Sequence, residues 1–231
     1  MRVVVAGGHG AVARLTARRL VADGHEVVGI VRNPDHVADL EQDGAVPVVA
    51  DLERVDADAL AAVVQGADAV LFAAGAGPGS GTARKDTVDR GAAVLLADAA
   101  ERAGVRAYVL VSSMGADGVR DGATPDGVDE VFLAYLRAKL AAEDDVLARD
   151  GLDAVVLRPG HLTDSPAGGR VRLARSVDAG DVPRDDVAAV LVALLGAAVD
   201  GRAGRRTVLE LVAGDEPVDD AVRAAVGSDR G

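Results

Sequence analysis

The sequence predicts an α/β fold in which a doubly wound parallel sheet carries helices on both faces. Short runs of Val, Leu and Ala, typical of strands buried on both faces, alternate with longer helical stretches along the 231 residues. A glycine-rich turn joins the first strand to the first helix. Hydrophobic residues make up 49% of the chain and aromatic residues only 2%, which favours a core of helices packed on a sheet over one built by aromatic stacking.

The apolar runs define the order of the elements. The predicted strands are Arg2–Ala6, Glu26–Val31, Val46–Ala50, Ala69–Ala73, Ala107–Val111, Ala154–Leu157 and Thr207–Val212. The predicted helices are Ala11–Asp23, Leu52–Gln65, Thr82–Ala103, Val128–Arg149 and Asp185–Val199. Strands that alternate with helices in this way form a parallel sheet with right-handed crossovers.

The regular alternation indicates a single domain over residues 1–231, with no long linker. Two irregular segments, 115–127 and 159–183, interrupt it, and a short strand is expected at Arg170–Ala174. Both segments follow strand carboxyl ends, where doubly wound folds bind ligands. The segments assigned to a substrate region or a small C-terminal appendage are 160–182 and 205–231.

Composition and charge exclude several functions. A net charge of −12 disfavours binding to nucleic-acid backbones. The chain has no Cys, and its four His residues lack metal-ligand spacing, so no metal is expected. No apolar run approaches the roughly 18 residues of a membrane helix, and no signal peptide is recognised. We therefore expect a cytoplasmic monomer or homodimer that binds a small molecule and neither nucleic acid nor membrane.

The glycine turn after the first strand is typical of a dinucleotide site. Glycines permit a tight turn and let the backbone approach a pyrophosphate. The free N–H groups at the start of the next helix favour a phosphate there, and a His in the turn can add a donor. A strand, glycine turn and helix in this order predict a Rossmann-type site. The residues assigned to it are Gly7, Gly8, His9, Gly10, Ala11 and Val12.

The end of the second strand favours NADP(H) over NAD(H). An NAD(H) site usually places an acidic residue there to bind the ribose 2′-hydroxyl. Here Arg32 and Asn33 occupy this position, while Glu26 lies at the opposite end of the strand. A guanidinium pairs with a 2′-phosphate as a planar fork of donors. We assign Arg32 and Asn33 to the cofactor site; the alternative for Arg32 is a solvated loop residue.

Two further strand ends fit the adenosine half of this site. Asp51 and Leu52 follow the third strand, where an Asp can reach the adenine amino group. Asp51 can equally be the N-cap of the helix that follows. The small residues Ala73, Ala74 and Gly75 follow the fourth strand and let the backbone lie flat against the adenine ribose.

A Ser, a Tyr and a Lys indicate proton-transfer chemistry. Ser112 and Ser113 end the fifth strand, and Tyr135 and Lys139 share one face of a predicted helix because they lie four residues apart. An ammonium beside a Tyr favours the phenolate and lowers the Tyr pKa towards the range useful for proton transfer. A Ser hydroxyl can hold the substrate oxygen. The alternative is that Tyr135 is a packed helix aromatic and Lys139 alone contacts the cofactor.

Together these motifs resemble the short-chain dehydrogenase/reductase superfamily and, within it, the compact atypical NAD(P)-binding (NmrA-like) group, over residues 1–212. The resemblance implies a catalytic Ser at Ser113, a catalytic Tyr at Tyr135, and contact of Pro159 with the nicotinamide. It also implies that Lys139 binds the nicotinamide ribose and lowers the Tyr pKa. The matching motifs are Gly7-Gly8-His9-Gly10, Val31-Arg32-Asn33-Pro34, Asp51-Leu52, Val111-Ser112-Ser113 and Leu157-Arg158-Pro159-Gly160-His161-Leu162.

We therefore predict an NADP(H)-dependent oxidoreductase that transfers hydride to a small carbonyl, quinone or flavin-like substrate. Tyr135 would be the general acid and base. Lys139 would lower the pKa of Tyr135 and bind the nicotinamide ribose, and Ser113 would bind the oxyanion. One alternative is a non-catalytic NADP(H)-binding redox sensor, since atypical members often lack the Tyr. Another is a sugar-nucleotide epimerase or dehydratase, which the short 160–182 region disfavours.

Overall fold

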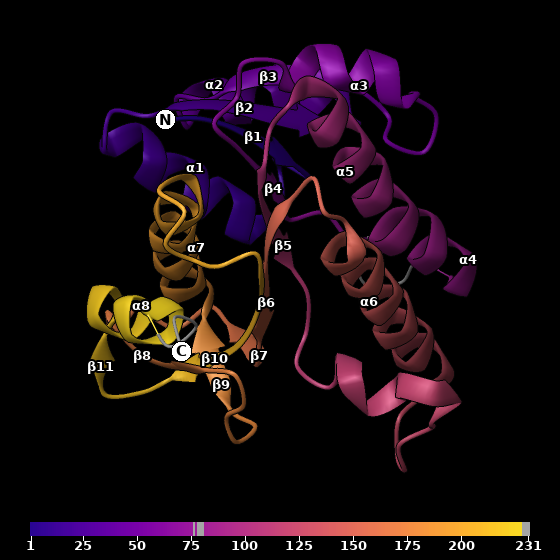
Figure 1. The fold of residues 1–231 in the computed structure, drawn as a ribbon, viewed down its shortest axis with the longest axis vertical. Helices are drawn as coiled ribbons and strands as arrows, with labels where there is room; N and C mark the ends of the chain where they lie inside the picture. Colours follow the sequence, from indigo (N-terminus) through magenta and orange to yellow (C-terminus); the bar gives the residue numbers. More distant parts are fainter. Residues whose placement is uncertain (76, 78–80, 228–231) are drawn as a thin grey trace.

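A computed structural model, which describes residues 1–75, 77 and 81–227, confirms the doubly wound sheet (Figure 1). The nine described strands of this sheet lie in the order β11-β8-β10-β6-β5-β4-β1-β2-β3. All neighbours from β3 to β10 pair in parallel, and β8 and β11 add an antiparallel edge. The strands of this sheet are β1 (Arg2–Ala6), β2 (Glu26–Val31), β3 (Val46–Val49), β4 (Ala69–Phe72), β5 (Ala107–Val111), β6 (Asp153–Pro159), β8 (Arg170–Ala174), β10 (Arg206–Ala213) and β11 (Glu216–Pro217).

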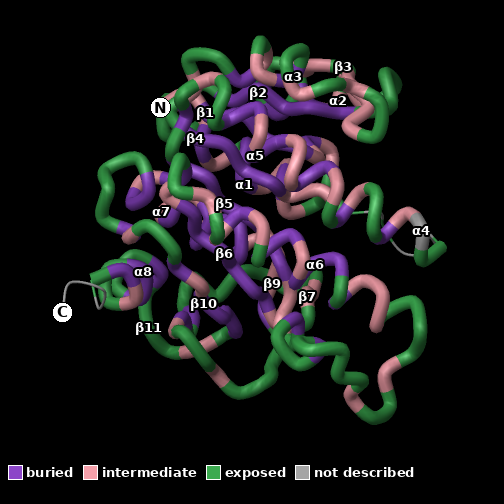
Figure 2. Tube along the Cα trace, turned by 45° about the vertical axis from the view of Figure 1, so that its right-hand side comes forward, coloured by how far each residue is buried: buried purple, intermediate pink, exposed green. Residues whose placement is uncertain are grey.

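Helices cover both faces of the sheet, and alternate strand residues divide between them. Val3 and Val5 of β1 pack with one set of helices, whereas Val4 and Ala6 pack with the other. Figure 2 shows the buried layers that result. The first set is α1 (Ala11–Ala22), α2 (Val37–Gln42), α7 (Arg184–Val199) and α8 (Val218–Gly227), and the second is α3 (Ala57–Val64), α5 (Ala92–Ala103) and α6 (Glu130–Ala148). Among the described helices, none is long and apolar enough to cross a membrane.

The short helix α2 after β2 escapes the sequence prediction. It is preceded by the 3₁₀ turn η1 (Pro34–His36), whose N-cap Asn33 accepts a hydrogen bond from Asp35 N at 3.1 Å. Leu40 is the residue of α2 that is buried in the core. A single buried position produces no 3.6-residue period, so the apolar pattern could not indicate this helix.

Acidic N-caps shift the start of two predicted helices. The helix expected from Leu52 begins at Ala57, because the side chain of Asp56 accepts a hydrogen bond from Ala59 N at 2.8 Å. The helix expected from Val128 begins at Glu130, after the N-cap Asp129. Asp51 is therefore not the cap of α3, which leaves it free of that structural role.

The stretch expected as one helix over Thr82–Ala103 is helical but contains a π-helical turn. The three-residue α4 (Thr82–Arg84) leads into the π turn η2 (Lys85–Gly91), and η2 leads into α5. Such turns are frequent at functional sites. Here η2 brings Lys85 and Asp89 into the buried part of the molecule, although both are charged.

The C-terminal segment joins the sheet rather than standing beside it. β10 lies between β6 and β8, with Leu209 opposite Leu157 and Leu211 opposite Leu173. Of the expected appendage at 205–231, residues 228–231 lie outside the described part of the chain. The expected substrate region at 160–182 supplies β8 and a separate parallel pair, β7 (His161–Thr163) and β9 (Asp181–Pro183).

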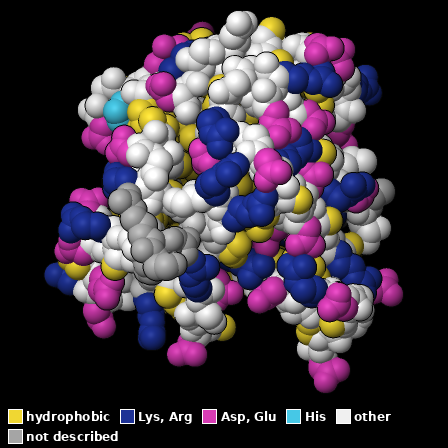
Figure 3. All heavy atoms as spheres, in the orientation of Figure 1, with side chains coloured by type: hydrophobic (Ala, Val, Ile, Leu, Met, Phe, Trp, Pro, Cys, Tyr) yellow, Lys and Arg dark blue, Asp and Glu magenta, His cyan; other side chains and the backbone are white. Residues whose placement is uncertain are grey.

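Charged side chains are mixed over the surface rather than segregated, as Figure 3 shows for one face. Asp43, which follows α2, is largely buried and accepts hydrogen bonds from Arg14 Nε at 2.5 Å and Arg18 Nη1 at 3.0 Å. Burial opposes ionisation of Asp43, but the two hydrogen bonds and the positive charge of both Arg residues outweigh it and lower its pKa. The Asp43 carboxylate therefore fastens the end of α2 to α1.

We expect Asp43→Asn to flatten the acid end of the stability–pH curve. Because the folded-state pKa is lowered, the stabilisation from Asp43 is present above the unfolded value of about 3.9 and is lost as pH falls through the folded pKa. Chemical denaturation at pH 7 and pH 3 should show a smaller acid loss of unfolding free energy than in the wild type. Asp58→Asn, in the exposed pair with Arg102, is the control and should keep the wild-type loss; equal effects would contradict the assignment.

Candidate functional site

Two adjacent cavities open at the carboxyl ends of the parallel strands. The first, of about 310 Å³, lies over the ends of β1 to β4. The second, of about 1030 Å³, lies between the ends of β4, β5 and β6, the helix α6 and the loops around β7 and β9. Both are lined by Gly10, Ala73, Ala74 and Gly75, so they form two halves of one groove. Folds of this type bind dinucleotides across such a groove, at the switch in strand order.

The glycine loop allows the backbone of neighbouring strands to approach closely. Gly7 has a φ of +80°, and a Cβ there would lie 2.5 Å from Ala74 Cα at the end of β4. A Cβ on Gly8 would lie 3.0 Å from Gly29 Cα in β2. Side chains at these positions would force the loop away from the strand ends. The two glycines therefore let the loop lie directly against the strand ends that border the groove.

The start of α1 presents its N–H groups at the same place. Gly10 is the N-cap and donates to Gly7 O at 2.9 Å. The first turn, which begins with Ala11 and Val12, contains no acidic residue, and both residues line the second cavity. A helix N-terminus of this kind attracts a phosphate through its free N–H groups and dipole.

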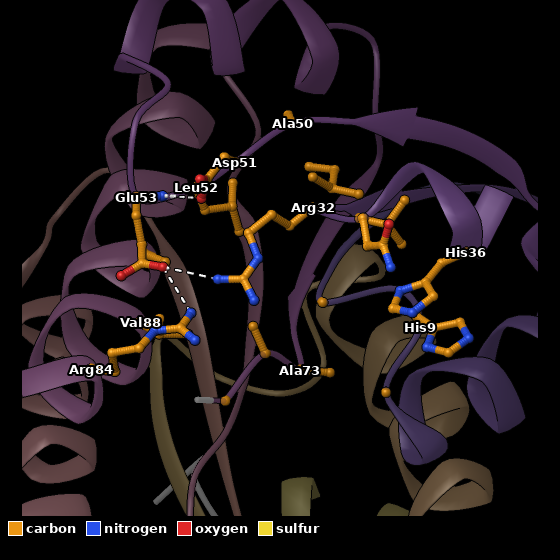
Figure 4. A pocket seen from close by; sticks show the side chains of 18 residues that line it. His9, Arg32, His36, Ala50, Asp51, Leu52, Glu53, Ala73, Arg84 and Val88 are labelled. Carbon is orange, nitrogen blue, oxygen red and sulfur yellow. Dashed lines mark hydrogen bonds and ion pairs between the residues drawn. The ribbon is translucent and has the colours of Figure 1, made fainter. Parts of the chain in front are cut away.

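His9, expected as a donor to the phosphates, has partners of its own. Its ring stacks on His36 with centroids 3.5 Å apart, and its Nε2 lies 2.7 Å from Asp39 Oδ2. This hydrogen bond is the main reason that the pKa of Asp39 is lowered. Both rings line the first cavity, as Figure 4 shows, so the pair forms a wall beside the glycine loop.

Arg32, expected to bind a 2′-phosphate, points into the first cavity (Figure 4). Its Nη1 donates to Glu53 Oε2 at 3.2 Å, and Arg84 Nη2 donates to the same oxygen at 2.8 Å. Thr87 Oγ1 donates to Glu53 Oε1 at 2.7 Å. The Thr87 hydrogen bond, opposed by partial desolvation, acts with Arg84 and Arg32 to lower the pKa of Glu53. A carboxylate thus stands where two guanidinium groups converge.

The other expected adenosine-side residues line this cavity as well. Asn33 lies in its wall, but its side-chain oxygen caps η1. Asp51 and Leu52 line it too, and Asp51 Oδ1 accepts a hydrogen bond from Glu53 N at 3.1 Å. Asp51 therefore shapes the turn that presents Glu53. The small residues Ala73, Ala74 and Gly75 form the boundary with the second cavity.

Tyr135 and Lys139 of α6 both reach the second cavity, as their spacing predicts. The Tyr135 ring stacks on Phe132, with centroids 5.6 Å apart. Lys139 Nζ lies 5.6 Å from the Tyr135 ring centroid, and Lys85 Nζ, from η2, lies 5.3 Å from it. Lys85 and Lys139 are the only lysines in the sequence, so all the Lys ammonium groups of this chain lie beside one Tyr.

Lys139 is held by several groups at once. Only 3% of the residue is exposed, and Nζ donates to Val111 O at 3.1 Å and to Ala74 O at 3.3 Å. Asp89 Oδ1 lies 3.3 Å from the same nitrogen. A buried charge requires such pairing, because desolvation would otherwise cost several kcal/mol. Lys139 thereby joins α6 and η2 to the ends of β4 and β5.

The two Ser residues after β5 have different surroundings. Ser113 lines the second cavity, and its hydroxyl donates to Met114 O at 3.1 Å. Ser112 also lines it, but its hydroxyl donates to Glu143, a buried residue of α6. Arg158 Nη2 donates to the other carboxylate oxygen of Glu143 at 2.6 Å. Of the two hydroxyls, that of Ser113 is therefore the better placed to meet a substrate.

Pro159, which the resemblance assigned to contact with the nicotinamide, ends β6 and lines the second cavity. Its carbonyl accepts a hydrogen bond from Met114 N at 3.0 Å. A Cβ on the next residue, Gly160, would lie 2.1 Å from Gly180 O. Only Gly fits between the end of β6 and the loop before β9, so this wall of the cavity is backbone.

Five site residues escape prediction from the sequence. Lys85 and Asp89 lie four residues apart, and Glu143 follows Lys139 by four, so helical spacing was a signal for these three. Glu53 and Arg84 are 31 residues apart, and no sequence spacing connects them.

We expect Gly7→Ala to abolish cofactor binding. The new Cβ would overlap the backbone of Ala74 and push the glycine loop out of the groove, beyond the roughly 1–2 kcal/mol cost of a left-handed backbone. Gly24→Ala is a matched control, since Gly24 also has a φ of +80° but a Cβ there would meet no other part of the described chain within 4 Å. Calorimetric titration with NADPH should show binding by the control and not by Gly7→Ala; equal binding would contradict the steric argument.

Comparison with known proteins agrees with this geometry. Residues 7–198 match the family model described as NAD(P)H-binding. The uncharacterized sugar epimerase YhfK of Bacillus subtilis is 31% identical over 224 residues, which cover 96% of this chain and 99% of YhfK. A solved structure from Bacillus halodurans, described as an NAD-dependent epimerase/dehydratase, is 33% identical, with a TM-score of 0.84 and coverage of 97% and 99%.

A further solved structure is that of ChuY from Escherichia coli O157:H7, described as an anaerobillin reductase. It is 26% identical, has a TM-score of 0.76, and is aligned over 93% of this chain and 98% of its own. These similarities extend over nearly the whole chain and agree with the resemblance to atypical short-chain dehydrogenase/reductases. The protein belongs to the NAD(P)H-binding family.

Proposed function

We propose that the protein is an NADP(H)-dependent oxidoreductase that reduces a small carbonyl, quinone or flavin-like substrate. One observation carries the proposal: Tyr135 and two Lys ammonium groups lie in a cavity of about 1030 Å³ that continues into the glycine-loop half of the groove. The volume suits a drug-sized ligand, for which sites of roughly 300–1,000 Å³ are usual. The similarity to ChuY supports a reductase.

The residues of the groove fit a dinucleotide. Gly7 and Gly8 hold the loop close to the strand ends, and the N–H groups of Ala11 and Val12 would bind a pyrophosphate beside it. Arg32 would bind the 2′-phosphate, and Pro159 would lie against the nicotinamide. When bound, NADPH supplies the hydride that reduces the substrate.

Tyr135 would supply the proton that accompanies this reduction. Its hydroxyl would donate to the substrate oxygen as negative charge develops there, and the ammonium groups of Lys85 and Lys139 would stabilise the phenolate that remains. The Ser113 hydroxyl would donate a second hydrogen bond to the same oxygen. Lys139 would act on Tyr135 from a fixed position, because Asp89 and two backbone carbonyls bind its Nζ.

The same contacts favour a second candidate function. Because Lys139 Nζ already interacts with Val111 O, Ala74 O and Asp89, a nicotinamide ribose would have to compete for it. A protein that binds NADP(H) without turning it over, as a redox sensor does, would tolerate this arrangement. Turnover by the wild type separates the two functions.

The mouth of the second cavity favours a flat, conjugated substrate. Phe132 is 45% exposed and Val131 is 44% exposed, and both line the cavity beside Tyr135. Met114 and Leu162 line it as well. An exposed aromatic ring stacked on Tyr135 is suited to pack against a quinone or flavin ring. This apolar rim gives less support to an epimerase acting on a sugar nucleotide, the activity that the name of YhfK suggests.

We expect Tyr135→Phe to lower kcat by about 10²–10⁴-fold, the usual contribution of a positioned acid, while NADPH affinity is retained. The assay is NADPH oxidation with a panel of quinones, flavins and carbonyls. Tyr108→Phe changes the other Tyr, whose buried hydroxyl donates to Ala93 O at 2.8 Å, and should keep kcat while losing about 1 kcal/mol of stability. Unchanged turnover in Tyr135→Phe would refute its role; wild-type binding without turnover would favour the sensor.

We also expect Phe132→Ala to raise KM for an aromatic acceptor by about three- to tenfold, since a stacked aromatic pair is worth about 0.5–1.5 kcal/mol beyond area burial. The affinity for NADPH should not change, because Phe132 lies at the substrate end of the groove. Val199→Ala, another exposed apolar residue but one outside both cavities, is the control and should leave KM unaltered. A KM unchanged in Phe132→Ala would overturn the proposed stacking.

A further inference from the structure

The carboxylate of Glu53 is bound in the way that proteins bind a phosphate. It accepts hydrogen bonds from Arg32 at 3.2 Å, from Arg84 at 2.8 Å and from the hydroxyl of Thr87 at 2.7 Å. Three segments meet here: the end of β2, the turn after β3, and the α4–η2 segment (Figure 4). Two Arg forks and a hydroxyl are donors typical of phosphate recognition.

The α4–η2 segment directs its residues to the two halves of the groove separately. Arg84 and Thr87, three residues apart, bind Glu53 at the adenosine half. Lys85 and Asp89, four residues apart, line the second cavity and contact Tyr135 and Lys139. Residues on one face of the segment therefore contact Glu53, and residues on another face line the second cavity. The position of Arg84 beside Arg32 is therefore set by the same segment that builds the wall of the reaction cavity.

Arg32 and Arg84 can bind a 2′-phosphate only if the Glu53 carboxylate moves away from both guanidinium groups. Arg32, Arg84 and Glu53 together carry a net charge of +1 in the paired state. An organic phosphate brings about −1.5 to −2 charges at pH 7 and three acceptor oxygens, so it can replace a carboxylate as the partner of both guanidinium groups. Glu53 is 25% exposed on its side chain, so solvent can receive it when it is displaced.

We propose that Arg84 and Arg32 together form the 2′-phosphate site, and that Glu53 occupies this site as an internal competitor that sets the preference between NADP(H) and NAD(H). The inference rests on the proposed function and adds two specificity-determining residues to it. Glu53 reduces the affinity for a 2′-phosphate by its own negative charge. In the absence of that phosphate, it holds both Arg residues in the geometry that the phosphate needs.

The test compares adenosine 2′,5′-bisphosphate with ADP by calorimetric titration. These probes contain only the adenosine half of the cofactor, so their binding does not depend on substrate or turnover. Arg84→Gln should weaken adenosine 2′,5′-bisphosphate about tenfold, equivalent to about 1.4 kcal/mol, and Glu53→Gln should strengthen it by about three- to tenfold. ADP affinity should not change in either variant. Arg54→Gln is the matched control. Arg54 is an exposed residue of the same loop, and its guanidinium pairs with Asp51 rather than with Glu53.

Three outcomes would overturn the inference. If Arg32→Ala weakens adenosine 2′,5′-bisphosphate while Arg84→Gln and Glu53→Gln match Arg54→Gln, the NADP(H) preference stands without the two further residues. If Glu53→Gln weakens ADP instead, Glu53 binds ribose hydroxyls and the site prefers NAD(H). If the wild type binds adenosine 2′,5′-bisphosphate no more tightly than 5′-AMP, which lacks only the 2′-phosphate, the NADP(H) preference also fails, and turnover with NADH then decides separately whether the protein is an oxidoreductase.

Discussion

The buried contact between Lys139 and Asp89 is the constraint on which the second cavity depends. Lys139 joins α6 to η2 through this ion pair, and it joins both to the ends of β4 and β5 through the carbonyls of Ala74 and Val111. An ammonium this deeply buried cannot be left unpaired without a large cost. The position of Tyr135, one helical turn before Lys139, follows from this anchoring.

The segment that carries Asp89 also contributes residues to both halves of the groove. Its Arg84 and Thr87 donate to Glu53 at the first cavity, and its Lys85 lies in the second cavity with Tyr135. The two halves meet at Gly10 and Ala73–Gly75, where side chains are small or absent and the strand ends come close to the glycine loop. The two cavities therefore share one wall, so the proposed cofactor half would adjoin the proposed substrate half.

Positive charge gathers locally in the groove, although the chain as a whole is acidic. The chain carries a net charge of −12, yet both of its lysines and the converging Arg32 and Arg84 lie in the groove. Elsewhere many Arg residues are paired with nearby Asp or Glu, as in the cluster of Arg149 with Asp98, Glu101 and Asp145. The compact Lys ammonium suits the closely packed contacts around Lys139, whereas the Arg fork suits carboxylates and phosphates.

The sequence by itself determined the alternating strands and helices of a doubly wound sheet, the glycine loop, and the meeting of Tyr135 with Lys139, because these depend on period, turn chemistry and helical spacing that lie within short segments. Arg32 and Asp51 could likewise be assigned to strand ends. Only the tertiary structure decided that Glu53 stands between Arg32 and Arg84, and that Asp89 and Glu143 bind Lys139 and Ser112. Those pairs join segments far apart in the chain, so their geometry is fixed by crossover connections and packing.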